Sequence, residues 1–409
     1  MFNKKLSVNK SLKLNLLYRV VVLFQILSLI YSYTTGFLTG DYISYEFKNS
    51  FNLILAFIFC LLPFYIIKTL LTKKKFVDNN VSSFNDIDSF KYVCAVLLVL
   101  NILFSFFFNV GKSATDIYSA PILLKPIIVV VNRININILA GFLLLSSRVT
   151  FKFKIFVLIG IITLALSRAS ISIFLYLFLL FLIKNGNSKK PNNVFLYTMI
   201  IACFGLLILW LGPALYQFRD AYRSGNTEIN YSDILESTNY FDFIFGKIIG
   251  RISNISSFVF FVENINLMKS TVYKLDYFSY FIEYFKPIWG SFVDYKFNSY
   301  TYYFTNLFDV YAENDYGIMY GLPSVLILSY LSLPVLPFFI ILLIIVTVIL
   351  IILISKRLFG NLFREFSLIL LFFPLTSGVA PEFFQILIDL FILYLLKTIL
   401  LSHKPINLK

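Results

Sequence analysis

The stretch Val335–Ser355 reads VLPFFIILLIIVTVILIILIS and contains no charged side chain. A helix needs roughly 20 predominantly apolar residues to cross the hydrocarbon core of a bilayer, so this stretch predicts a membrane-spanning helix. The whole chain has a matching composition. Of its 409 residues, 59% are apolar and 14% are charged, whereas soluble domains carry about 25% charged residues. The sequence therefore predicts an all-α, polytopic integral membrane protein.

Nine further apolar runs are long or apolar enough to be candidate spans, which predicts about ten transmembrane helices in total. They are Leu17–Thr34, Phe51–Leu71, Phe90–Val110, Pro121–Ser146, Ile155–Leu166, Ala169–Ile183, Val194–Leu211, Phe366–Ser377 and Phe383–Leu401. The fifth and sixth of the ten, and Phe366–Ser377, are short. The lysine-rich N-terminus resembles a signal sequence, but no small-residue cleavage site follows Ser32, so we expect an uncleaved first span.

Basic residues alternate along the chain between the predicted loops. They gather at residues 73–75, 148–154, 184–190, 356–364 and 404–409, whereas the short loops on the other face carry only three. Cytoplasmic loops of membrane proteins collect Lys and Arg, so both termini and these loops are predicted to be cytoplasmic. The net charge of +14 follows from this pattern, and we expect no nucleic-acid partner.

A polar segment, Pro213–Tyr316, interrupts the apolar runs and is predicted to lie on the outer face. It holds twelve of the chain's 21 acidic residues against eight basic ones. It is too large for a turn, so it is either a separate domain or a cover over an active site, and we favour the cover. Inside it, Phe243–Met268 predicts one apolar-rich helix.

The stretch Gly317–Pro334, interrupted by prolines, predicts an interfacial or re-entrant segment rather than a span. If it were a span, the basic loop at residues 356–364 would move to the outer face. The chain is therefore divided into residues 1–212 with seven spans, 213–334 with the outer loop and re-entrant segment, and 335–409 with three spans and the tail.

Arg133 lies inside the fourth predicted span, among Asn132, Asn135 and Asn137. A charge at that depth costs at least ~2.5–3.5 kcal/mol, so it needs a partner or a wet cavity. An ion pair with Asp389 in the last span and a contact to a lipid phosphate are both open.

The other candidate cations lie on the predicted outer face. Arg168 follows Ser167, a plausible helix N-cap, so phosphate could bind there, or the arginine could extend to lipid headgroups. Arg219 and Arg223 are one helical turn apart and could clamp a pyrophosphate by forked hydrogen bonds, with Arg251 as a third cation. The alternative is ordinary surface charge paired with Asp220.

No metal or cofactor is expected. Asp86-Ile87-Asp88 has the DxD spacing by which glycosyltransferases hold a divalent cation, but a solvated cytoplasmic loop explains it better. The three cysteines all fall in apolar runs, and the single histidine, His403, lies in the tail.

Four features together resemble the O-antigen polymerase (Wzy-type) family of oligosaccharide repeat unit polymerases. They are the Ser-Arg junction between spans at Leu166–Ser170, the single large outer loop opening with arginines, Gly250-Arg251-Ile252-Ser253 within it, and Gly321-Leu322-Pro323-Ser324 before the next span. The family pattern has glycines where this chain has Pro334 and Pro337.

The resemblance implies a metal-independent glycosyltransferase with a GT-C-like architecture in a bacterial inner membrane, its large loop periplasmic. Its substrate would be an undecaprenyl-diphosphate-linked oligosaccharide, polymerised into O-antigen or a capsule-like polysaccharide within the lipopolysaccharide pathway, with a chain-length regulator as a possible partner. Arg133, Arg168, Arg219, Arg223 and Arg251 would bind the pyrophosphate. Three carboxylates are candidates for the general base: Asp220, Glu313 and Asp315.

Two other functions fit the same layout. An O-antigen ligase is similar, but that chemistry is associated with a histidine in the outer loop, and His403 is predicted to be cytoplasmic. A lipid-linked oligosaccharide flippase or another transporter is the second. Transporters often show internal repeats and short loops, and this chain has neither pattern.

Overall fold

The computed structural model describes residues 2–42, 45–72, 88–108, 121–145, 149–167, 171–185, 212–214, 243–289, 300, 303 and 320–402. Within these ranges the chain is helical and contains no β-strand, apart from an isolated bridge between Phe37 and Glu46. The predicted all-α class is confirmed for this part of the chain.

Four helices of the described residues are long and apolar enough to cross a membrane. They are α1 (Phe2–Thr35), α2 (Ser50–Thr72), α4 (Asp88–Phe107) and α19 (Leu336–Phe359). On α2 one face is buried, and the opposite face exposes apolar side chains such as Ile54, Ile58 and Leu62. A helix that is apolar on its exposed face as well is typical of a membrane span.

The remaining helices at predicted span positions are α7 (Phe151–Ser167), α8 (Ile171–Asn185), α20 (Phe363–Ser377) and α21 (Ala380–Ser402). A short turn, η6 (Gly360–Leu362), joins α19 to α20. With 15 residues each, α8 and α20 are about 22 Å long, less than the ~30 Å of a typical hydrocarbon core. The predicted span Val194–Leu211 lies outside the described residues.

The fourth predicted span, Pro121–Ser146, is not one continuous helix. It forms α5 (Lys125–Arg133) and α6 (Ile136–Leu145), with a break between them. Asn101 of α4 donates its amide to the carbonyl of Val131 at 3.1 Å, and the carboxylate of Asp389 accepts the N–H of Asn135 at 3.2 Å. These side chains satisfy backbone groups that the break leaves without helical partners.

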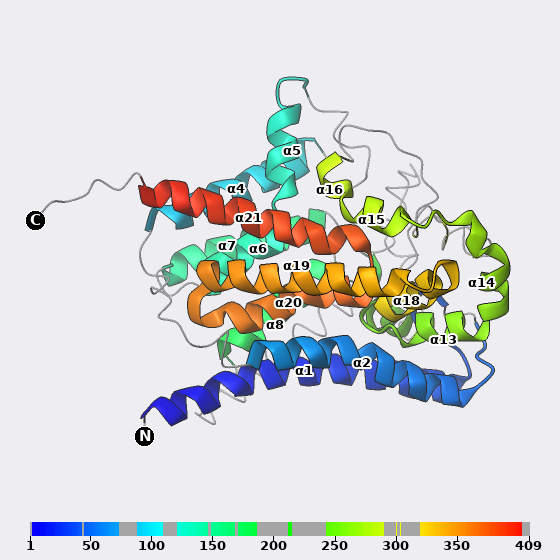
Figure 1. Ribbon diagram of the computed structural model, residues 1–409. Helices are drawn as coiled ribbons and strands as arrows, with labels where there is room; N and C mark the ends of the chain where they lie inside the picture. Colours follow the sequence, from blue (N-terminus) through cyan, green and yellow to red (C-terminus); the bar gives the residue numbers. More distant parts are fainter. Residues whose placement is uncertain are drawn as a thin grey trace, which may run out of the picture.

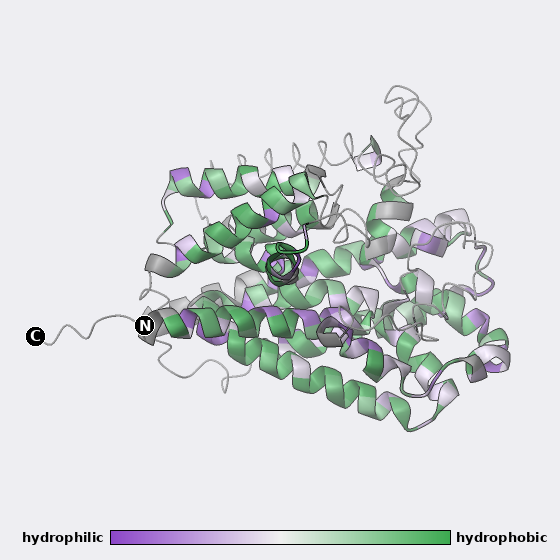
Figure 2. Ribbon diagram, turned by 90° about the horizontal axis from the view of Figure 1, so that it is seen from above, coloured by the Kyte–Doolittle hydropathy of each residue, from purple (hydrophilic) through white to green (hydrophobic). Residues whose placement is uncertain are grey.

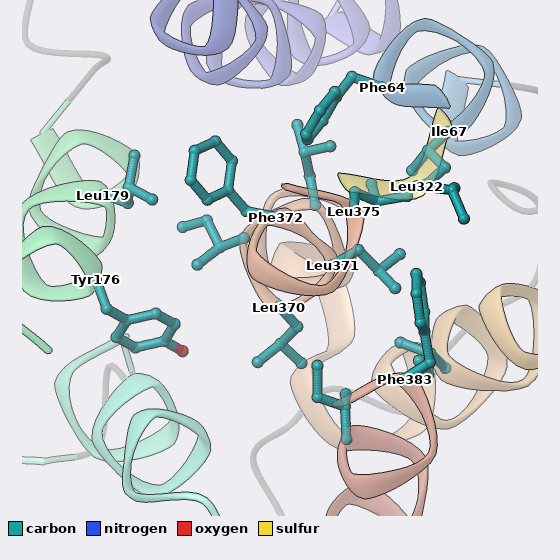
Figure 3. Close-up of a cluster of buried hydrophobic side chains, with 14 of the residues drawn as sticks. Phe64, Ile67, Tyr176, Leu179, Leu322, Leu370, Leu371, Phe372, Leu375 and Phe383 are labelled. Carbon is teal, nitrogen blue, oxygen red and sulfur yellow. The ribbon is translucent and has the colours of Figure 1, made fainter. Parts of the chain in front are cut away.

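Helix α20 lies at the centre of the bundle and is buried along nearly its whole length. Figure 3 shows its side chains meeting those of α2, α8, α18 and α21 around Leu370, Leu371, Phe372 and Leu375. Helices α1 and α2 run side by side along one side of α20, and α19 and α21 pack together along another (Figure 1). Hydrophobic residues dominate these long helices (Figure 2).

Part of the large polar segment packs at one end of this bundle, away from the start of α1 and the end of α21 (Figure 1). Its elements are η3 (Phe243–Ile249), α12 (Gly250–Ile252), α13 (Ile255–Glu263), α14 (Ile265–Thr271), η4 (Val272–Lys274), α15 (Ser279–Tyr284) and α16 (Lys286–Trp289). The prediction of one helix over Phe243–Met268 is wrong. The chain breaks at residues 253–254, where Asn254 donates its side-chain amide to the carbonyl of Leu375 at 3.1 Å.

The segment between the large loop and α19 contains α18 (Gly321–Ser332). Its 12 residues give a length of about 18 Å, too short to cross a bilayer. It packs against α13, α19 and α20. Pro334 follows it in the turn, and Pro337 lies in the first turn of α19, where a missing N–H costs nothing. The predicted break at Pro323 is wrong, because α18 continues through this residue in its first turn; the interfacial or re-entrant placement stays a prediction.

Basic side chains lie at the end of the bundle opposite the large segment. Lys356 and Arg357 occupy the last turn of α19. Arg357 donates to the hydroxyl of Tyr394 at 2.8 Å, and Lys397 donates to the carbonyl of Arg357 at 2.9 Å. Cations at a helix C-terminus complement its dipole, so these contacts stabilise the ends of α19 and α21 together.

Candidate functional site

Six of the eight predicted site residues lie outside the described residues: Asp220, Glu313, Asp315, Arg168, Arg219 and Arg223. For Arg133 and Arg251 the structure describes the backbone, in α5 and α12 respectively. The structure shows what packs around these two backbone positions and which groups contact the acidic side chains Glu263 and Glu283 of the large segment.

The backbone at Arg251 is held against the loop that joins α1 to α2. A Cβ atom on Gly250 would lie 2.1 Å from both Cα and N of Gly40. The backbones at Gly250 and Gly40 therefore touch and leave no space for a side chain. Gly40 has φ +73°, a left-handed conformation that favours glycine, and begins η1 (Gly40–Tyr42). On the other side, Ser253 donates to the side-chain oxygen of Gln25 of α1 at 2.9 Å. The Arg251 backbone is thus fixed between η1 and α1.

Three chain segments meet beside this position. Gly321, at the start of α18, has φ +69°, and a Cβ there would lie 3.0 Å from the Cβ of Asn254. Gly378, in the turn between α20 and α21, has φ +71°, and a Cβ there would lie 2.5 Å from the carbonyl carbon of Gly321. The stretches Gly250–Ser253 and Gly321–Ser324 therefore lie on adjacent elements. We call the meeting point of Asn254, Gly321 and Gly378 the three-segment junction.

A chain of hydroxyl groups ties η1 to α1 and α13. The Ser28 and Thr39 hydroxyls are 2.7 Å apart, and the Thr39 and Ser256 hydroxyls are also 2.7 Å apart. All three residues are buried. Because these groups satisfy one another, their role is to hold the large segment on the bundle.

Glu263, at the end of α13, anchors the start of α2. Its carboxylate accepts the backbone N–H groups of Lys48 and Asn49, at 2.9 and 3.0 Å, and the side-chain amide of Asn52 at 3.2 Å. Tyr45 donates its hydroxyl to the same carboxylate at 3.3 Å. A carboxylate with four donors is a structural anchor rather than a candidate base.

A second carboxylate, Glu283 of α15, lies among tyrosines. Ser279, Tyr280 and Glu283 are all buried, and their spacing puts them on one face of the helix. The rings of Tyr280 and Tyr300 meet edge to face with their centroids 5.5 Å apart. We call Ser279, Tyr280, Glu283 and Tyr300 the α15 cluster.

The electrostatics of the α15 cluster follow from burial. Burial raises the pKa of Tyr280 well above its ordinary value, and Tyr300 and then Glu283 raise it further. The pKa of Tyr300 is also raised, first by burial and then by the Glu283 charge. Both phenols therefore stay protonated at neutral pH and keep an O–H that can donate a hydrogen bond.

Helix α15, which carries most of the α15 cluster, packs against the first turns of α21. The ring of Tyr284 lies 5.0 Å from that of Phe384, and the Tyr284 hydroxyl hydrogen-bonds the Thr347 hydroxyl of α19. Phe384 lies in the second turn of α21, which begins two residues after Gly378 of the three-segment junction. Sequence reasoning missed Glu283 because no clear period was found in the stretch Tyr273–Tyr311. The signal available in the sequence was the i, i+1, i+4 spacing of Ser279, Tyr280 and Glu283.

The backbone of Arg133 lies at the end of α5, at the break in the fourth predicted span. Two residues on, Asn135 donates its N–H to Asp389, whose other carboxylate oxygen accepts the amide of Gln385 at 2.6 Å. The fully buried Asp389 carboxylate therefore lies close to the Arg133 backbone. This placement agrees with the ion pair considered from the sequence, and the side-chain contact itself is a prediction.

A metal site is not found among the described residues, where no group of three or more His, Cys, Asp or Glu side chains converges. Of the DxD pair, Asp88 begins α4, and Asp86 lies outside the described residues. Cys60 and Cys94 are buried thiols without a disulfide.

The fold and these contacts define an all-helical protein with helices suited to a membrane and a polar segment packed on one end. Comparison with protein-family models, curated proteins and solved structures finds no match to the chain.

Proposed function

We propose that this protein is a membrane glycosyltransferase that polymerises undecaprenyl-diphosphate-linked oligosaccharide repeat units at the periplasmic face of a bacterial inner membrane. The growing glycan is transferred as a block to the non-reducing-end sugar of one lipid-linked unit. A glycosidic bond forms, and undecaprenyl diphosphate leaves. The product is O-antigen or a capsule-like polysaccharide.

One observation carries this proposal. The stretches Gly250–Ser253 and Gly321–Ser324 are two of the four features that resemble the O-antigen polymerase family, and they are far apart in the sequence. Asn254, the residue after the first stretch, contacts Gly321, the first residue of the second stretch, at the three-segment junction. The resemblance rests on both stretches, and the contact between Asn254 and Gly321 brings their neighbouring backbones together in the fold.

The chemistry needs fixed cations more than a protein nucleophile. The leaving diphosphate gains negative charge as its bond to the glycan breaks, and preorganised guanidinium groups stabilise that charge. The backbone of Arg251, between η1 and α1, lies three residues before Asn254 of the three-segment junction, and we assign this arginine to the diphosphate site. Arginine also binds phosphate through two parallel hydrogen bonds, so a divalent cation is not required.

A lipid-linked oligosaccharide flippase is the second candidate, and one observation favours it. The fourth predicted span is broken at residues 134–135, and Asp389 binds the exposed backbone there. Discontinuous helices with polar partners at membrane depth form substrate and ion sites in many transporters. The O-antigen ligase alternative gains no such support, since His403 lies outside the described residues.

Reconstitution separates the three functions. Purified protein in liposomes is supplied with lipid-linked repeat units extracted from cells that lack this chain, and the glycan is analysed by gel. The proposal predicts a ladder of lengthened lipid-linked glycan without lipid A–core. A ligase would transfer glycan only when lipid A–core is added. A flippase would move the units across the bilayer without lengthening them, and either result would contradict polymerisation.

A further inference from the structure

Two hydroxyl groups of the α15 cluster are buried without a hydrogen bond. Tyr280 is 0% exposed and Ser279 is 1% exposed, and neither hydroxyl has a hydrogen-bond partner among the described residues. A buried polar group without a partner destabilises the folded state, so such groups are rare and call for an explanation. Ser279 and Tyr280 precede Glu283 by four and three residues, so each neighbours the carboxylate on the helix. We take the two hydroxyls as groups whose hydrogen bonds a polar ligand would complete.

The chemistry of the cluster fits a sugar. Glu283 accepts hydrogen bonds, whereas the phenol and serine hydroxyls both donate and accept. A sugar presents adjacent hydroxyl groups that need both kinds of partner. The rings of Tyr280 and Tyr300 are buried and pack edge to face, which holds the two phenols in place. A phosphate or a lipid chain would suit the cluster less well, because a carboxylate repels the first and polar groups disfavour the second.

The position of the cluster also fits. Helix α15 packs against the first turns of α21 and reaches α19 through Tyr284 and Thr347. The same first turns of α21 follow the Gly378 turn of the three-segment junction. A sugar bound at the cluster would therefore lie near the elements that carry the proposed diphosphate site, on the side of the large segment.

We propose that the α15 cluster is the subsite for the acceptor sugar and that Glu283 is the general base of the transfer. The acceptor hydroxyl oxygen bonds to the anomeric carbon of the donor glycan as the bond from that carbon to the diphosphate breaks. The diphosphate leaves with the bonding electron pair, and the hydroxyl proton passes to the Glu283 carboxylate. This inference rests on the proposed function and assigns its acceptor site and base.

The test uses matched tyrosines in the full-length protein. Tyr280→Phe removes a buried hydroxyl without a partner. The control, Tyr303→Phe, removes a buried hydroxyl that pairs with Thr271 at 2.6 Å. Glu283→Gln keeps the size of the side chain and removes the base. Each purified variant is assayed in liposomes for kcat and KM with lipid-linked repeat units, and its thermal midpoint is measured.

We expect Tyr280→Phe to raise KM about 3- to 10-fold, the effect of one lost hydrogen bond, with a thermal midpoint equal to or above that of the wild type. Tyr303→Phe should lower the midpoint and leave the kinetics within about twofold of wild type, because its lost bond is internal. Glu283→Gln should lower kcat about 100- to 10,000-fold, the range for general acid–base catalysis.

Two results would overturn the inference. One is wild-type kinetics in both Tyr280→Phe and Glu283→Gln. The other is a Tyr280→Phe variant that loses thermal stability as Tyr303→Phe does while its KM stays unchanged, since that result would assign its hydroxyl an internal partner. If Glu283→Gln does not fold, Tyr280→Phe decides alone. Absence of polymerisation by the wild-type protein would instead refute the proposed function.

Discussion

Replacing Gly250 with alanine should destabilise the protein through a contact between two backbones. The new Cβ would lie 2.1 Å from Cα and N of Gly40 and 2.9 Å from the carbonyl oxygen of Phe245. All three atoms belong to the main chain, so relief requires η1 or α12 to move. Overpacking of this kind costs about 1–3 kcal/mol, and the better helix propensity of alanine offsets about 1 kcal/mol. The net loss should be about 0–2 kcal/mol.

Gly160→Ala is the matched control. Gly160 lies in α7, and a Cβ there would meet only the terminal methyl of Ile102, at 2.9 Å, which a rotamer change can move. Both variants gain the same helix propensity, so the difference between them isolates the backbone contact. In detergent, the thermal midpoint of Gly250→Ala should lie about 1–4 °C below that of Gly160→Ala, since the unfolding entropy of a chain of this length is large. Equal midpoints would refute the packing of the large segment against η1.

Three further predictions address topology, metal dependence and the arginines. Cysteines replacing Asn230 and Asn298 should react with an impermeant maleimide in intact spheroplasts, whereas one at Asn361 should react only after permeabilisation; external labelling at Asn361 would make Gly317–Pro334 a true span. Polymerisation by the purified protein should survive excess EDTA, and a loss that magnesium or manganese restores would refute the arginine site. Removal of the Arg168 or Arg223 guanidinium should slow transfer about 30- to 1000-fold. Lysine restores a forked contact only in part, so Arg168→Lys and Arg223→Lys should still reduce the glycan ladder to one repeat at normal membrane levels. Near-normal ladders in both variants would make these arginines structural.

The apolar runs predicted the long helices well because a span is a local property. Val335–Ser355 lies within α19 except for its first residue, and Phe51–Leu71 lies within α2. The breaks were not predicted, because their causes lie far away in the sequence. The fourth predicted span breaks where Asn101 and Asp389 reach its backbone, and no pattern within residues 121–146 encodes those partners.

The same reasoning explains the large segment. The apolar content of Phe243–Met268 predicted one helix, but Gln25 and the carbonyl of Leu375 bind the chain at Ser253 and Asn254 and interrupt it. The burial of Phe243–Met268 depends on the helices that it packs against, and the residue pattern within this stretch does not identify those helices.

The candidate site was predicted through exposed charges, since an arginine pair is visible in a sequence. The α15 cluster was not predicted, because the spacing of its polar residues is also typical of a solvent-exposed helix surface. Only its burial beside α21 distinguishes Glu283 from Glu263, whose carboxylate is fully used in anchoring the start of α2. Burial of that kind is a tertiary property.

The glycan ladder of cells that lack this chain tests the central claim most directly. If the protein polymerises lipid-linked repeat units, these cells should carry single repeats on their acceptor and no long chains, and expression of the wild-type chain should restore the ladder. A full ladder in the absence of the chain would contradict the account. So would the loss of even the single repeat, because a missing ligase or flippase produces that result.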